Sequence, residues 1–64
     1  MQLLQEVSSP DHIATAKIYD DSGTFFVEYW VNGNLQRTFN SSQSLEEIVY
    51  FANQWVGSVQ TLNG

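Results

Sequence analysis

The sequence predicts an α+β domain, a three-stranded antiparallel meander followed by one C-terminal helix packed on one sheet face. The sheet becomes four-stranded if the N-terminal segment also pairs. Three observations lead to this fold: β-prone runs separated by turn residues, a helix-capping signal before a helical apolar pattern, and a length of only 64 residues. Because domains rarely fall below this size, residues 1–64 are expected to form one domain.

The N-terminal residues leave two interpretations open. Residues 1–10 begin with an apolar patch and end in Ser-Ser-Pro, after which Asp11 follows. An apolar start with a proline-containing turn is typical of a short edge strand, and it is equally consistent with a loose arm.

Three segments have the composition of strands. Residues 12–19 and 24–31 are rich in β-branched and aromatic side chains, and a third run spans residues 35–39. The intervening residues 20–23 (Asp-Asp-Ser-Gly) and 32–33 (Asn-Gly) are turn signals, and Asn-Gly accepts the positive φ angles of tight hairpins. Consecutive strands should therefore pair as a meander.

The second hairpin has two candidate registers, which differ in the sheet face that each side chain occupies. A two-residue turn places Glu28 opposite Arg37 and Phe26 opposite Phe39, with an ion pair worth about 0.2–1 kcal/mol. A loop of odd length instead gathers Phe25, Val27, Tyr29, Val31, Leu35 and Phe39 on one face. The other face then carries Phe26, Glu28, Trp30, Gln36 and Thr38. We favour the odd loop, because burying Leu35 and Phe39 at about 1.5–3 kcal/mol each outweighs one exposed ion pair.

The helix is predicted to begin at a capping box, Ser44-Leu45-Glu46-Glu47, in which Ser44 and Glu47 satisfy each other's backbone amides. The apolar positions that follow lie three and four residues apart and form one stripe: Leu45, Ile48, Val49, Ala52, Trp55, Val56 and Val59. Gly57 is expected to end or loosen the helix. Residues 60–64 are expected to be a frayed tail.

Composition excludes several function classes. The chain has no cysteine, so disulfides, thiol nucleophiles and thiolate metal sites are excluded. Its formal net charge of −5, with Lys17 and Arg37 as its two basic residues, disfavours nucleic acid as a partner. We recognise neither a signal peptide nor a membrane span, so we expect a cytoplasmic protein without membrane contact.

The candidate interface consists of Phe26, Glu28 and Trp30 on the sheet face away from the helix, together with Tyr50 on the far side of the helix. Scattered exposed aromatics are common in a small protein and need no function. Two large aromatics two residues apart on a strand nevertheless form a contiguous apolar surface, and Trp and Tyr are enriched at interface hot spots. Self-association as a homodimer is the simplest way to bury such a face.

Candidate catalytic and metal sites are weak. His12 follows Asp11, which could orient it as a general base, but no motif positions a nucleophile, so a surface histidine is the better interpretation. Residues 20–23 resemble a fragment of a calcium loop without its alternating acidic spacing, and a hairpin turn explains them. We therefore predict no enzyme activity, no cofactor and no metal.

Two resemblances accompany this interpretation. Residues 37–39 (Arg-Thr-Phe) and 44–48 (Ser-Leu-Glu-Glu-Ile), after an aromatic strand, resemble the last strand and helix of AP2-type and integrase arm-type DNA-binding domains. Those domains read DNA with basic and aromatic side chains on the open sheet face, where this chain has hardly any cation. Residues 14–19 and 26–33 resemble short uncharacterised proteins of phages that infect marine cyanobacteria. That resemblance implies a phage accessory protein in the host cytoplasm.

The function we expect is a non-enzymatic protein-interaction module, a homodimer that also contacts an unidentified partner, which is a host protein if the chain is phage-encoded. The alternative is a nucleic-acid-binding module or an acidic decoy of a DNA-binding protein.

Overall fold

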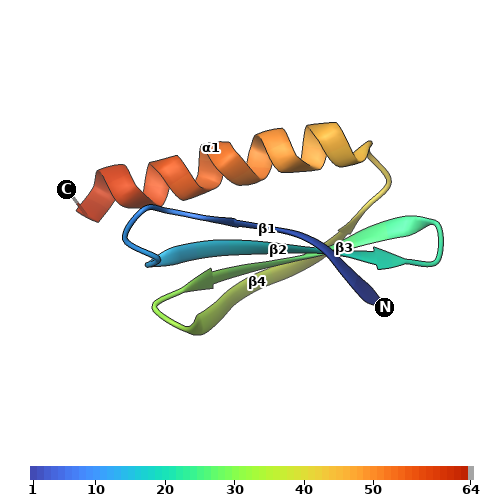
Figure 1. Ribbon diagram of the computed structural model, residues 1–64, viewed down its shortest axis with the longest axis horizontal. Coiled ribbons are helices and arrows are strands. Elements are labelled where there is room, and N and C mark those ends of the chain that lie inside the picture. Colours follow the sequence, from blue (N-terminus) through green and yellow to red (C-terminus); the bar gives the residue numbers. More distant parts are fainter. Residues whose placement is uncertain (64) are drawn as a thin grey trace.

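A computed structural model describes the backbone of residues 1–63 and the side chains of residues 1–59. Four strands are followed by one helix: β1 (Gln2–Ser8), β2 (Ala14–Asp21), β3 (Thr24–Val31), β4 (Asn34–Ser41) and α1 (Leu45–Asn63). The strands form one antiparallel sheet in the order β1-β2-β3-β4 (Figure 1). The α+β meander is confirmed, and the N-terminal segment is its fourth strand, at one edge.

The two hairpins β2-β3 and β3-β4 each turn through two residues with positive φ. Ser22 and Gly23 have φ of 49° and 96°, and Asn32 and Gly33 have φ of 52° and 77°. Two such residues in succession match the right-handed twist of the flanking strands. The turn signals in the sequence are thereby confirmed.

The β3-β4 hairpin combines features of both predicted registers. Its turn is a two-residue turn, since Val31 pairs with Asn34, but the register shifts at Tyr29/Trp30 and leaves Gln36 as an extra residue. Beyond this β-bulge Val27 pairs with Phe39, so the two lie on one face, as the odd loop predicted. The prediction for Leu35 was wrong, because Leu35 pairs with Trp30 on the opposite face.

Helix α1 starts at the predicted capping box. The Ser44 backbone N–H donates to Glu47 Oε1 at 3.4 Å, and the Glu47 N–H donates to Ser44 Oγ at 3.3 Å. The helix continues past Gly57, so the prediction that Gly57 ends it was wrong. Of residues 60–64, which were expected to fray, the structure describes only the helical backbone as far as Asn63.

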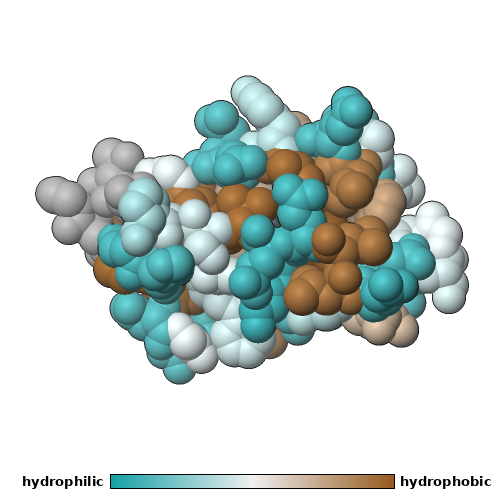
Figure 2. All heavy atoms as spheres, viewed as in Figure 1, coloured by the Kyte–Doolittle hydropathy of each residue, from teal (hydrophilic) through white to brown (hydrophobic). Residues whose placement is uncertain are grey.

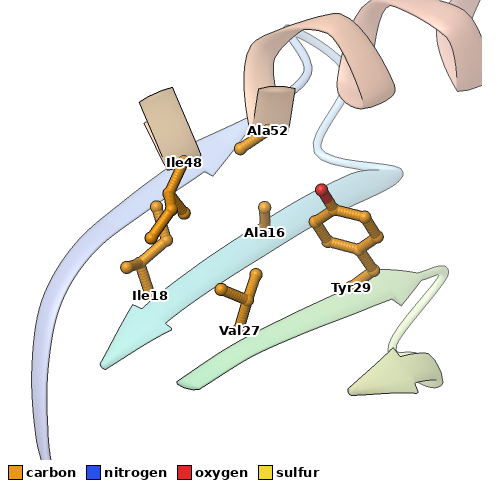
Figure 3. Packing of buried hydrophobic residues seen from close by; sticks show 6 residues of the cluster. All are labelled: Ala16, Ile18, Val27, Tyr29, Ile48 and Ala52. Atoms are coloured by element: carbon orange, nitrogen blue, oxygen red, sulfur yellow. The ribbon is translucent and has the colours of Figure 1, made fainter. Parts of the chain in front are cut away.

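The core lies between α1 and one face of the sheet. Its buried members come from β2, β3 and α1: Ala16, Ile18, Val27, Tyr29, Ile48 and Ala52 (Figure 3). At the edge of this cluster the Trp55 ring stacks on Tyr29, with centroids 4.2 Å apart and an interplanar angle of 8°. The predicted apolar stripe of the helix therefore faces the sheet.

The helix leaves part of this face uncovered. It packs mainly against β1 and β2, and β4 lies farthest from it (Figure 1). Neighbouring strands are about 4.8 Å apart and a helix is about 10 Å wide, so one helix can cover about two of four strands. Large apolar side chains remain exposed, among them Leu35, Tyr50 and Phe51. Figure 2 shows apolar surface on one side of the molecule.

Candidate functional site

The sheet face opposite the helix, which we call the open face, carries aromatic and apolar side chains at both ends. At one end Phe26 pairs with Tyr19, whose partner on β1 is Leu3. At the other end Trp30 pairs with Leu35. Side chains of directly paired residues share one face, so these five residues form two apolar groups on the same surface.

A charged row separates the two groups. Glu6 pairs with Lys17, Lys17 pairs with Glu28, and Glu28 pairs with Thr38. The row crosses all four strands and places a cation between two carboxylates. Because charges of opposite sign alternate, the net electrostatic potential of the row is small. The same side chains can still form ionic contacts at the rim of an interface.

Glu28 contacts the indole at one end of the open face. Trp30 Nε1 donates a hydrogen bond to Glu28 Oε1 at 3.3 Å. The Lys17 Nζ atom lies 5.1 Å from the Trp30 ring centroid, within range of a cation–π interaction. These contacts orient the Trp30 ring before any partner arrives.

The pKa of the Tyr19 hydroxyl is raised, first by desolvation and then by its hydrogen bond to Glu28 and the negative charges of Glu28 and Glu6. Tyr19 therefore stays protonated at neutral pH. The open face thus presents a neutral hydroxyl at one end and an indole N–H bonded to Glu28 at the other.

Three of the four predicted interface residues lie together. Phe26, Glu28 and Trp30 share the open face, and the Phe26 and Tyr19 ring centroids are 6.1 Å apart. Tyr50 is 59% exposed on the helix and contacts the Phe51 ring edge-on at 5.5 Å. Because the helix lies on the other side of the sheet, Tyr50 belongs to a separate surface.

The β1-β2 connection holds His12, the weak candidate for a general base. The Asp11 carboxylate accepts hydrogen bonds from the Ser9 hydroxyl at 2.5 Å and from the Ile13 N–H at 3.1 Å, and these bonds lower its pKa. His12 is exposed and has φ of 62°, a turn conformation. Asp11 thus stabilises the loop and does not orient the imidazole.

The structure also bears on metal and membrane binding. Across the described residues, no three His, Asp or Glu side chains gather where they could hold a metal ion. Residues 20–23 form the end of β2 and the tight turn into β3. The described part of the chain contains no helix with the length and hydropathy needed to span a bilayer.

Sequence reasoning missed three apolar or aromatic members of the open face, Tyr19, Leu35 and Leu3. Tyr19 could have been found, because Ala14, Ala16 and Ile18 lie on the buried face of β2 and the residues between and after them, including Tyr19, lie on the opposite face. Leu35 and Leu3 could not, because a bulge lies beside each of them and reverses the expected alternation.

Comparison with known proteins gave no relative: no protein family, curated protein or solved structure matches this chain.

Proposed function

We propose that this chain is a small non-enzymatic protein-interaction module that associates with a second copy of itself through the open face. The observation that carries the proposal is the position of Phe26 and Trp30, which lie on the sheet face that the helix leaves uncovered. Tyr19, Leu3 and Leu35 extend the same surface.

The chemistry of this face suits an isologous dimer. Large aromatic side chains at the centre of an interface supply most of its binding energy, and rings held in place before binding lose little side-chain entropy. The Trp30 ring is held by its hydrogen bond to Glu28 and by the cation–π contact with the Lys17 ammonium. A two-fold axis through the face would bury both apolar groups of each copy.

The charge distribution favours a basic surface on any further partner. The carboxylates Asp20 and Asp21 end β2, and Glu46 and Glu47 start the helix, so four acidic residues lie at the same end of the molecule (Figure 1). In the proposed setting, suggested by the phage resemblance, the partner is a host cytoplasmic protein that the acidic module covers. Electrostatic attraction would act mainly on the rate of association.

The arrangement of cations argues against the nucleic-acid alternative. Lys17 lies on the open face, whereas Arg37 pairs with Tyr29 on the helix side of the sheet. The two basic side chains therefore cannot contact one phosphate backbone together, and affinity for DNA depends on several such contacts.

Sedimentation equilibrium of the intact chain tests the dimer. We expect a concentration-dependent dimer for the natural sequence and a monomer for Trp30→Ala over the same range. Tyr50→Ala is the matched control, because it removes an exposed aromatic residue from the other side of the molecule. Circular dichroism of each variant would verify that it is folded.

Two results would contradict the proposal. One is a monomer at high micromolar concentration of the natural chain. The other is a dimer that dissociates in Tyr50→Ala and persists in Trp30→Ala.

A further inference from the structure

Strand β4 is a free edge with the properties of a template for strand addition. It spans Asn34–Ser41, it pairs with β3 on one side only, and it contains neither proline nor a carboxylate. An unprotected edge offers a row of backbone N–H and C=O groups to another chain. Both edge strands have a bulge, but β1 also carries Glu6 and packs against the helix.

A hollow lies beside this edge on the helix side of the sheet. It has a volume of about 230 Å³, and its lining residues come from β3, β4, the following loop and α1: Tyr29, Arg37, Phe39, Gln43, Ile48 and Phe51. It exists because the helix packs mainly against β1 and β2, so that β4 lies farthest from it (Figure 1). Phe51 is 49% exposed at its rim.

The hollow is apolar and cationic in a protein of net charge −5. The Arg37 guanidinium lies 5.2 Å from the Phe39 ring centroid, and its charge partly offsets the increase that burial causes in the pKa of Tyr29. No carboxylate is found among the described residues that line the hollow. A carboxylate flanked by apolar groups is therefore its complement.

We propose that β4 binds an extended segment of a partner protein as a fifth strand, with alternate side chains in the order apolar, acidic, apolar directed into this hollow. Strand addition gives affinity through main-chain hydrogen bonds and specificity through the pockets that receive alternate side chains. The acidic side chain would pair with Arg37, and charge-assisted pairs of arginine with carboxylate are strong and directional.

A second copy of this chain is a poorer occupant. Pairing of β4 with β4 of another copy would bring two Arg37 side chains into one neighbourhood, with no carboxylate on either strand. Like charges placed opposite each other disfavour a pairing. The surface is also distinct from the open face, so the two proposals can fail independently.

The probe is the blocked peptide Thr-Leu-Thr-Glu-Thr-Leu-Thr, acetylated and amidated so that its only charge is the glutamate. Its sequence is palindromic and fits an edge strand in either direction. Titration into the intact, isotope-labelled chain should shift the NMR signals of residues in β4 and around the hollow. Hydrogen exchange should slow at alternate amides of β4 and stay unchanged in β1.

Charge is tested on both molecules. Arg37→Glu should weaken binding of this peptide at least about tenfold. The natural chain should bind a peptide with lysine in place of glutamate at least about tenfold more weakly than it binds the glutamate peptide. The same Arg37→Glu variant should bind the lysine peptide better than the natural chain does. Trp30→Ala, which alters the open face, should leave peptide affinity unchanged within about twofold. Because the lysine peptide needs no change in the protein, misfolding of a variant cannot explain its loss.

Three results would overturn the proposal. The first is equal affinity for the glutamate and lysine peptides. The second is equal affinity for the shuffled peptide Thr-Thr-Leu-Leu-Glu-Thr-Thr, which lacks the alternation. The third is protection of β4 amides by self-association of the chain without peptide, since a second copy would then be the occupant.

Discussion

Replacing Trp55 with alanine should lower the free energy of unfolding by about 2–3 kcal/mol. Full removal of a buried tryptophan costs about 3–5 kcal/mol, but this side chain is only half-buried. Much of the loss comes from the stack on Tyr29, where the rings are 4.2 Å apart, and such pairs contribute about 0.5–1.5 kcal/mol beyond the buried area. For a domain of this size the change corresponds to a decrease in Tm of about 8–24 °C.

Urea unfolding of Trp55→Ala and Trp30→Ala at a concentration where the natural chain is monomeric would isolate the effect. Binding to a second copy adds stability that depends on concentration, so dilution removes that contribution. Under these conditions Trp55→Ala should be clearly the less stable variant, because Trp55 closes the core and Trp30 lies on the open face. Equal losses of unfolding free energy in monomeric Trp55→Ala and monomeric Trp30→Ala would refute the division of the sheet into a covered and an uncovered face.

Three further predictions concern single elements of the fold, all measurable by urea unfolding. Ser44→Ala should cost about 0.5–2 kcal/mol, because it removes the hydroxyl that bonds with Glu47 at the helix start, and no measurable loss would place the cap elsewhere. Deletion of Gln36 should cost less than about 1 kcal/mol, since it removes only the unpaired bulge residue and keeps the pairs beyond it. Above neutral pH, stability should stay constant up to about pH 10 and then decline, since burial raises the pKa values of Tyr29 and Tyr19 in the folded chain and the unfolded chain loses these protons first. Tyr29→Phe should make this decline shallower, and an unchanged slope would mean that the Tyr29 hydroxyl is solvated.

Local signals were sufficient wherever a short segment determines its own conformation. The capping box located the start of the helix at Ser44, and Asn32-Gly33 located a hairpin, because both depend on contacts within a few residues. Gly57 shows the limit of such signals. It lies within α1, where packing of the neighbouring Val56 against the sheet offsets the poor helix propensity of glycine.

The register was harder to predict, because it depends on two competing requirements. The Asn32-Gly33 turn demands a two-residue loop, whereas burial of Phe39 demands the pairing of an odd loop. Weighing the two as alternatives led to the wrong face for Leu35. The chain meets both requirements with one extra residue, Gln36, and no pattern in the sequence marks that position.

The bulge also determines which surface receives which chemistry. Without it, the two-residue turn would place Arg37 opposite Glu28 on the open face, where the cation would pair with a carboxylate. With it, Arg37 moves to the helix side next to Tyr29, and Phe39 pairs with Val27 on the same side. Leu35 precedes the bulge, so its pairing with Trp30 follows from the two-residue turn alone. The cationic hollow beside β4 therefore depends on the bulge, whereas the apolar end of the open face depends on the turn.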